Sequence, residues 1–349
     1  MRTQFSPWAL ALVAGVSLAA NAVEARDTIQ IAGSSTVLPF ASVVAEEFSH
    51  AYAQYKTPVV GSGGTGGGLR QFCQGVGTNT LDIANASRAI KDAEVAACQQ
   101  AGVKEILEVQ IGYDGIVFAS RTDGKPFALT PEHIFTAAAA EIMVDGKQVK
   151  NPYTHWSQID KKLPDQSIML IVPASNHGTR EVFEERVLAP GCAAALPLDA
   201  MSKETQDKVC KSLRNDGRVV EVAGDYSETL VRLQVQPEAV GVFGLGFYEQ
   251  NRDRLQLATV DGVTASAATI SSGEYPVSRP LFIYVKGEHL GAIKGLKEYV
   301  EYFLSEDVSG AGSPLEDIGL IPLPSDERER VLQRFTQRQA VTAQSSTLK

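Results

Sequence analysis

The chain has 349 residues, 21% of them charged and 44% hydrophobic, and its 32 basic and 41 acidic side chains give a net charge of −9. A chain of this length predicts two lobes of about 100–200 residues each, and its composition excludes both a multi-span membrane protein and a disordered chain. The acidic balance, without a basic stripe, argues against nucleic acid as a partner. An anion bound by this protein would therefore need a local site of aimed hydrogen-bond donors.

Residues 1–25 have the features of a signal peptide. A positive start at Met1 and Arg2 precedes an apolar run over residues 8–20, which is long enough for a signal-peptide core and too short to span a bilayer. Ala22 and Ala25 both end suitable cleavage motifs, of which we favour the second, and no cysteine follows to carry a lipid. We expect a cleaved signal peptide and a protein exported to the periplasm or secreted.

Strand and helix signals alternate along the rest of the chain. Apolar residues at helical spacing follow a short apolar strand at 28–32 and predict a helix over 37–53. This order predicts an α/β fold with a mainly parallel sheet that helices cover on both faces. The remaining predicted elements are strands at 59–60, 81–86, 106–109, 116–119, 168–172, 219–222, 240–243 and 276–285, and helices at 69–74, 91–101, 131–140, 180–188, 226–233 and 291–304.

Four cysteines, Cys73, Cys98, Cys192 and Cys210, make up the whole complement. An even number in an exported chain predicts two disulfides, and the sequence allows three pairings. We favour Cys73–Cys98 with Cys192–Cys210, because each bridge then closes a short loop within one lobe. The alternative, a metal site, lacks a CxxC motif and suitably spaced histidines.

Small hydroxyl or glycine residues lie between a strand and a helix at four places, in residues 33–36, 61–68, 85–88 and 175–180. The start of a helix leaves backbone N–H groups unpaired and carries a partial positive charge, and Ser or Thr adds a hydroxyl donor. Each motif alone is explained by helix capping, and the glycine loop lacks the Lys of a nucleotide-binding loop. Their recurrence, with Arg88 and Arg180 among them, favours a site for a small tetrahedral oxyanion.

Five segments, four of which overlap these places, together resemble the periplasmic phosphate-binding proteins of the Pst ABC transporter, the PstS family. They are, in chain order, residues 33–40, 64–68, 82–88, 113–115 and 178–180. The resemblance runs from about residue 28 to about residue 325 and implies the type II periplasmic-binding-protein fold, with two α/β lobes, a two-strand hinge and phosphate in the cleft. We then expect lobe one at 26–116 plus 276–335, lobe two at 117–275 and a flexible C-terminal tail at 336–349.

The resemblance also implies which residues hold the phosphate. At the helix starts of lobe one these are Ser35, Thr36, Val37 through its backbone N–H, Thr65, Ser87 and Arg88, and in lobe two they are His177, Gly178, Thr179 and Arg180.

Two positions depart from the pattern of the family. His177 stands where the family usually has Ser, and Ser87 stands where some members have an Asp that accepts the proton of hydrogen phosphate. Asp114 is our candidate for that proton-accepting role.

We therefore expect a solute-binding protein, not an enzyme, that captures inorganic phosphate without a cofactor or metal and delivers it to the membrane permease of an ABC transporter. We expect it to act as a monomer. The alternatives are a binder of another tetrahedral oxyanion, a secreted phosphatase and an adhesion protein on the same fold. A phosphatase would need a metal cluster or an activated nucleophile, and no clustered Asp and His set is readable in the sequence.

Overall fold

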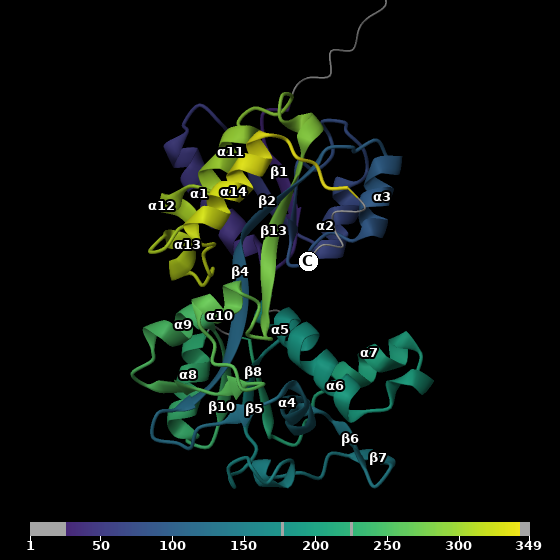
Figure 1. Ribbon diagram of the computed structural model, residues 1–349, viewed down its shortest axis with the longest axis vertical. Helices are drawn as coiled ribbons and strands as arrows, with labels where there is room; N and C mark the ends of the chain where they lie inside the picture. Colours follow the sequence, from purple (N-terminus) through teal and green to yellow (C-terminus); the bar gives the residue numbers. More distant parts are fainter. Residues whose placement is uncertain (1–25, 176–177, 224–225, 343–349) are drawn as a thin grey trace, which may run out of the picture.

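The computed structural model describes residues 26–175, 178–223 and 226–342, which form the two lobes shown one above the other in Figure 1. The predicted signal peptide and His177 lie outside the described residues. The upper lobe is built from both ends of the described chain: β1 (Gln30–Gly33), α1 (Leu38–Ala51), β2 (Val59–Ser62), α2 (Thr65–Phe72), β3 (Ile83–Ala86), α3 (Asp92–Gln100), α11 (Leu296–Phe303), α12 (Glu306–Ser309), α13 (Pro314–Asp317) and α14 (Ser325–Thr336).

The lower lobe is built from the middle of the chain. Its strands are β5 (Ala128–Leu129), β6 (Glu141–Val144), β7 (Lys147–Lys150), β8 (Leu170–Pro173), β9 (Val219–Val222), β10 (Val240–Gly244), β11 (Leu255–Leu257) and β12 (Thr259–Val260). Its helices are α4 (Pro131–Ala138), α5 (Gly178–Phe183), which continues as a π-helical turn over Glu184–Leu188, α6 (Ala189–Ala195), α7 (Lys203–Lys211), α8 (Tyr226–Val235), α9 (Leu245–Gln250) and α10 (Ala267–Ser271). Among the described residues, no helix is long and apolar enough to cross a membrane.

Two long strands, β4 (Ile106–Arg121) and β13 (Ser278–Lys286), connect the lobes. β4 pairs with β13 through Gly115 and with β10 from Ile116 onward. The two strands predicted at 106–109 and 116–119 are thus one strand of 16 residues. Tyr113, Asp114 and Gly115 interrupt the apolar pattern of β4 at the point where the strand leaves the upper core and enters the lower core. The backbone stays extended through these residues. The predicted lobe boundaries fall within β4 and just before β13.

The register of the sheet brings the carboxyl ends of its parallel strands together. Gly33, at the end of β1, is opposite Ser62 of β2 and Asn85 of β3. β13 runs antiparallel to β3, so its first residues lie at this same edge. In the lower lobe β8 is parallel to β9 and β10, and Gly244 at the end of β10 is opposite Ile116 of β4. The carboxyl edges of both sheets therefore meet at the waist of the molecule, where ligands bind in open α/β sheets.

Apolar side chains alternate along the upper strands and fill a core on each face of the sheet. Leu281 and Ile283 of β13 belong to one core, with residues of α1, α11 and α14, while Phe282 and Tyr284 belong to the other, with residues of α2 and α3. Figure 1 shows these two groups of helices on opposite sides of the sheet. This is the two-sided coverage that the strand and helix order predicts, since successive side chains of a strand point to opposite faces.

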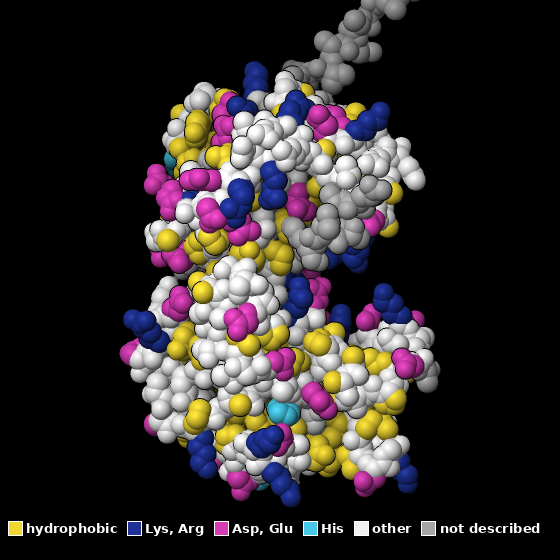
Figure 2. Space-filling view, in the orientation of Figure 1, with side chains coloured by type: hydrophobic (Ala, Val, Ile, Leu, Met, Phe, Trp, Pro, Cys, Tyr) yellow, Lys and Arg dark blue, Asp and Glu magenta, His cyan; other side chains and the backbone are white. Residues whose placement is uncertain are grey.

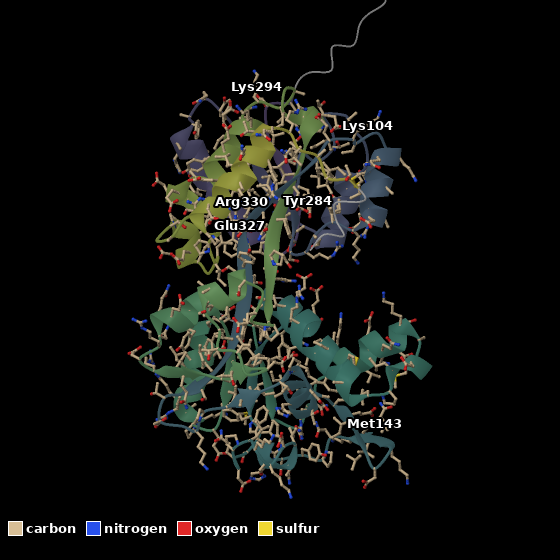
Figure 3. All side chains as sticks on the ribbon, viewed as in Figure 1. Lys104, Met143, Tyr284, Lys294, Glu327 and Arg330 are labelled. Carbon is tan, nitrogen blue, oxygen red and sulfur yellow. A yellow bond between two sulfur atoms is a disulfide. The ribbon has the colours of Figure 1, made fainter. Side chains whose placement is uncertain are left out.

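Polar contacts fix the connecting strands within the upper lobe. In Figure 3, Glu327 is labelled on α14, and its carboxylate accepts a hydrogen bond from the hydroxyl of Tyr113 on β4 (3.3 Å). Tyr284, labelled on β13, accepts a hydrogen bond from the backbone N–H of Ile90 (2.7 Å). Both strands are thereby attached to neighbouring segments through side chains as well as through the sheet.

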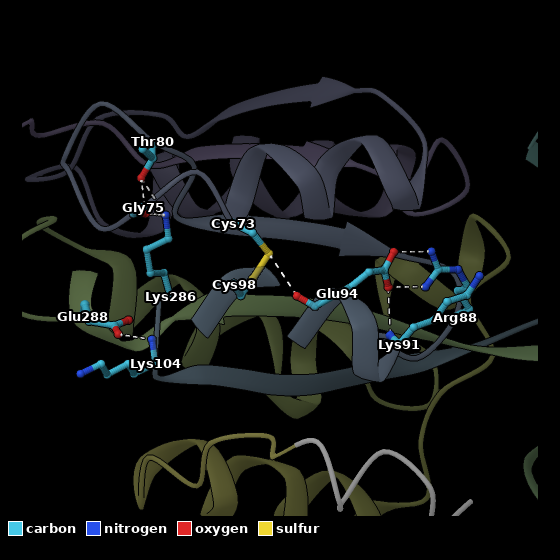
Figure 4. Close-up of a disulfide and its surroundings, with 10 residues drawn as sticks. All are labelled: Cys73, Gly75, Thr80, Arg88, Lys91, Glu94, Cys98, Lys104, Lys286 and Glu288. Atoms are coloured by element: carbon cyan, nitrogen blue, oxygen red, sulfur yellow. Dashed lines mark hydrogen bonds and ion pairs between the residues drawn. A yellow bond between two sulfur atoms is a disulfide. The ribbon is translucent and has the colours of Figure 1, made fainter. Parts of the chain in front are cut away.

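Both predicted disulfides are confirmed. Cys73 at the end of α2 is bonded to Cys98 of α3, as Figure 4 shows, and Cys192 of α6 is bonded to Cys210 of α7. Each bridge joins elements of a single lobe, so neither restricts movement of one lobe relative to the other.

Two local expectations differ from the structure. Ser87 and Arg88 do not begin a helix, because α3 starts four residues after Arg88, at Asp92, where Glu94 accepts from the backbone N–H of Lys91 (2.9 Å) and caps the first turn. The chain beyond α14 is attached to the upper sheet as far as Val341, since Ala340 forms an antiparallel bridge with Leu107 and Val341 donates to the Ile106 carbonyl (2.9 Å). Residues 343–349 lie outside the described residues.

Candidate functional site

A cavity of about 230 Å³ lies at the waist, where the two carboxyl edges face each other. Figure 2 shows the surface of the molecule hollowed between the lobes. The cavity is lined by both polar and apolar residues. Its lining residues are Ser35, Thr36, Asp114, Thr179, Tyr226, Gln250 and Asp317 together with Pro39, Phe40, Gly244, Phe247, Ile318 and Gly319. Four of the residues expected at the phosphate site, Ser35, Thr36, Asp114 and Thr179, are thus brought together.

Two glycines allow the strand ends of the upper lobe to approach closely enough to form this edge. A Cβ on Gly33, whose φ is +144°, would lie 2.2 Å from the carbonyl oxygen of Asn85, and a Cβ on Gly68 would lie 2.5 Å from the Cα of Gly33. Any side chain at either position would separate β1 from β3 or from α2. The loop that carries Ser35 and Thr36 is therefore fixed at the edge of the sheet.

Thr36 precedes the first turn of α1, which contains no acidic residue. Its hydroxyl accepts a hydrogen bond from Nη2 of Arg279 (2.7 Å) and donates to Oε2 of Glu181 (3.3 Å). The backbone N–H of Val37, next along the chain, has no hydrogen-bond partner within the described part of the structure, while its side chain is buried. This end of α1 therefore offers both a hydroxyl and an N–H donor.

Arg279, the second residue of β13, was missed by the sequence analysis. Its side chain is 1% exposed and is surrounded by three carboxylates: Asp114 (3.6 Å from Nε), Glu181 (3.3 Å from Nη2) and Glu185 (3.1 Å from Nη1). The Nε group itself has no hydrogen-bond partner among the residues that the structure describes. An arginine at the start of a strand that is otherwise apolar from Leu281 to Val285 is the signal that could have identified it.

Asp114 lies on β4 directly opposite Arg279 of β13. Its side chain is 15% exposed and lines the cavity. The pairing of the two connecting strands therefore places a carboxylate and a guanidinium together at the hinge. A ligand that contacts both lobes would lie next to them.

The lower lobe contributes two hydroxyl groups. Thr179 at the start of α5 and Tyr226 at the start of α8 both line the cavity, and their side-chain oxygens are hydrogen-bonded to each other. Burial raises the pKa of Tyr226 above its ordinary value, so the phenol stays protonated and can donate. Tyr226 was not predicted as a site residue, although it follows the carboxyl end of β9 as Thr179 follows that of β8.

Three of the expected side-chain donors in the upper lobe, Thr65, Ser87 and Arg88, lie outside the cavity lining. The backbone N–H of Ser87 donates to the hydroxyl oxygen of Thr65 (3.1 Å), and both side chains are buried. Arg88 donates two hydrogen bonds to the carboxylate of Glu94 (2.9 and 2.8 Å), as Figure 4 shows. Burial opposes ionisation of Glu94, but the hydrogen bonds from Arg88 and from the backbone of Lys91, together with the positive charges of these two residues, lower the pKa of this carboxyl group.

Arg180 also lies outside the cavity lining. Its Nε donates to Glu184 (2.8 Å), and its Nη1 donates to Glu221 (2.6 Å) and to the carbonyl oxygen of Pro173 (3.1 Å). The guanidinium is thus held between α5 and the ends of β8 and β9, within the lower lobe. A role for Arg180 as a direct anion ligand stays a prediction, as it does for Arg88.

The cavity is therefore lined by hydroxyl donors from both lobes, those of Thr36, Thr179 and Tyr226, which can hold an oxyanion. The guanidinium of Arg279 lies outside the lining but is hydrogen-bonded to the Thr36 hydroxyl, so its charge adjoins the cavity. Because Asp114 adds an acceptor, the arrangement suits an oxyanion that still carries a proton. No group of three or more His, Cys, Asp or Glu side chains is placed to bind a metal ion within the ranges described.

Known proteins resemble this chain over most of its length. The family described as the PBP superfamily domain matches residues 19–307. Protein SphX of Synechocystis sp. is 32% identical over 329 residues, which are 92% of this chain and 85% of that protein. The phosphate-binding protein PstS of Staphylococcus epidermidis is 29% identical over 297 residues, with coverage of 84% and 78%. The crystal structure of a possible phosphate binding protein from Planctomyces limnophilus has a TM-score of 0.70 and 27% identity, covering 89% of this chain and 98% of that one.

These matches confirm the resemblance that the sequence motifs indicate, and they extend across both lobes and both connecting strands. The chain belongs to the PBP superfamily, in the PstS family of exported solute-binding proteins.

Proposed function

We propose that this protein binds inorganic phosphate in the cavity between its lobes and presents it to the membrane permease of an ABC transporter. The observation that carries the proposal is the buried guanidinium of Arg279, which lies between a hydroxyl of the upper lobe and a carboxylate of the hinge. Support comes from the relatives, since PstS of Staphylococcus epidermidis is a phosphate-binding protein by name.

The cavity residues divide the recognition of hydrogen phosphate between donors and one acceptor. Arg279 and the hydroxyls of Thr36 and Thr179 donate to the charged oxygens, and Asp114 accepts the proton that hydrogen phosphate keeps at neutral pH. Sulfate has no such proton, so its oxygen would face the Asp114 carboxylate with repulsion between like charges. Asp114 thereby takes the role that an Asp at the position of Ser87 has in some members of the family.

Delivery requires the lobes to close over the anion and open again. β4 and β13 are the covalent connections between the lobe cores. Rotation of the lower lobe about the segment where these strands pass between the lobes would bring Thr179 and Tyr226 toward Thr36. We propose that the protein acts as a monomer in the periplasm after cleavage of residues 1–25, in the compartment where its permease would receive the closed form.

Calorimetry on protein stripped of bound ligand tests the proposal. We expect phosphate and its close analogue arsenate to bind, and sulfate to bind at least tenfold more weakly. In Asp114→Asn the preference for phosphate over sulfate should shrink, because the repulsive charge is gone. Equal affinities for sulfate and phosphate in the wild-type protein would contradict the phosphate assignment, and release of a chromophore from a phosphate ester would favour a phosphatase.

A further inference from the structure

Glu181, at the fourth position of α5, extends a carboxylate from the lower lobe onto a hydroxyl that lines the cavity and onto the guanidinium that is bonded to this hydroxyl. Its Oε2 lies 3.3 Å from Oγ1 of Thr36 and 3.3 Å from Nη2 of Arg279. Thr36 belongs to the upper lobe and Arg279 to the hinge strand. An acidic side chain thus contacts the two groups that, under the proposed function, hold the anion.

We propose that Glu181 is an internal competitor of phosphate: its carboxylate binds the hydroxyl of Thr36 and the guanidinium of Arg279, and the anion must displace it. This inference rests on the proposed function. A carboxylate oxygen and a phosphate oxygen are acceptors of the same kind, and both form strong charge-assisted hydrogen bonds to arginine. The two anions cannot occupy these donors together, since like charges at such a distance repel.

The burial of Arg279 explains why such a competitor would be useful. A guanidinium that is 1% exposed cannot be neutralised by losing its proton, so it needs an anionic partner at all times. Glu181 shares this role with Asp114 and Glu185 when phosphate is absent. Because its side chain is 34% exposed, it can rotate into solvent when phosphate takes its place, at little cost in buried charge.

The neighbouring Glu185 provides a matched control. It lies one helical turn further along, and its Oε2 is 3.1 Å from Nη1 of the same guanidinium. Its side chain is half exposed, and within the described chain it bonds to Arg279 but not to Thr36. Replacement of either glutamate by glutamine removes one negative charge beside Arg279, but only the Glu181 substitution also replaces the charged acceptor of Thr36 with a weaker, neutral one.

The experiment is calorimetry of stripped wild-type protein, Glu181→Gln and Glu185→Gln with phosphate and with sulfate at pH 8. We expect Glu181→Gln to bind phosphate three- to tenfold more tightly than the wild-type protein, with a smaller gain in Glu185→Gln. Sulfate affinity should rise by a similar factor in Glu181→Gln, because competition for donors does not depend on a proton of the ligand.

Three results would overturn the inference: unchanged affinity in Glu181→Gln, equal gains in the two variants, or weaker phosphate binding in Glu181→Gln. The last would make Glu181 an acceptor for the phosphate proton. Failure of the wild-type protein to bind phosphate would contradict the proposed function instead. A ligand-free measurement then decides on Glu181: the effects of Thr36→Val and Glu181→Gln on the midpoint of thermal unfolding should be non-additive, and additive effects would exclude the contact.

Discussion

The arginines near the waist differ in which groups neutralise them. Arg88 is paired with Glu94 within the upper lobe, and Arg180 is paired with Glu184 and Glu221 within the lower lobe. Arg279 instead contacts carboxylates of the hinge and of the lower lobe while it donates to Thr36 of the upper lobe. The guanidinium of Arg279 therefore joins groups of the upper lobe, the hinge and the lower lobe.

This difference predicts that one conservative substitution weakens phosphate binding and that another leaves it unchanged. Arg279→Lys keeps the charge but loses the planar, forked donor geometry, and we expect phosphate binding to weaken by about 1.5–3 kcal/mol, the value of a hydrogen bond to a charged group. Arg180→Lys should leave the affinity within about twofold, because its partners are all within the lower lobe. Calorimetry measures both, with circular dichroism as a check on folding. A loss in Arg180→Lys as large as in Arg279→Lys would show that Arg180 reaches the anion.

The site could be predicted from the sequence where its residues follow a strand and begin a helix. Thr36 and Thr179 have this position, and both line the cavity. Arg279 lies at the beginning of a strand and reaches the same edge because β13 is antiparallel to its neighbour β3, a pairing that the local sequence does not show. Arg88 follows a strand as expected, but its side chain is oriented by hydrogen bonds to Glu94, six residues further along the chain.

At the scale of elements, β13 connects the cavity to the far end of the upper lobe. It begins beside Arg279 and ends at Lys286, whose buried ammonium group donates to the carbonyl of Gly75 (2.6 Å) and the hydroxyl of Thr80 (2.7 Å), as Figure 4 shows. The same group lies 5.0 Å from the centre of the Phe72 ring. The strand is therefore held at the far end by a lysine that attaches it to the loop after α2.

Lys286 predicts a specific pH dependence of stability. Burial lowers its pKa to about 8, so between pH 8 and the ordinary lysine value the folded protein binds fewer protons than the unfolded chain. The free energy of unfolding should therefore rise with pH in this interval, as a burial cost of about 2 kcal/mol, after allowance for solvent screening, is relieved. Below pH 8 both states are protonated and the cost is present in full.

Denaturant unfolding at pH 7.5, 8.5 and 9.5 measures this effect as the difference between the wild-type protein and Lys286→Met. As the pH rises, the free energy of unfolding of the wild-type protein should increase relative to that of Lys286→Met. Lys104→Met, which removes an exposed lysine of the same lobe, should show no such trend. A difference between wild type and Lys286→Met that stays constant with pH would mean that Lys286 titrates normally.

The α/β class and most of the long elements of the fold could be predicted, because strands and helices alternate with clear apolar periods. The extent of β4 could not, since residues 113–115 lack the apolar pattern and the strand continues only through its pairing with β13 and β10. The four-residue helices α12 and α13 are too short to show a helical period, and they are fixed by packing of Val308 and Leu315 into the upper core.

At the scale of the whole molecule, the two lobes have separate apolar cores. The lower core is formed by residues from Ile116 to Val277 together with Ile321, and the upper cores by residues before and after that segment. They are connected by two strands, by the packing of Ile321 into the lower core and by the polar contacts of the waist. A ligand that contacts Thr36 on one side and Thr179 on the other therefore adds a connection between two units that are otherwise stabilised separately.

Phosphate should consequently stabilise both lobes and make the molecule more compact. At a concentration 1,000 times the dissociation constant, a ligand that binds the folded state alone adds about 4 kcal/mol to the free energy of unfolding. We expect stripped protein to unfold at a lower temperature and over a broader range than protein saturated with phosphate, and small-angle scattering to show a smaller radius of gyration with phosphate. Arg279→Lys at the same phosphate concentration should show a smaller gain on both measures. A higher unfolding temperature without any change in the radius of gyration would mean that phosphate binds without closing the lobes.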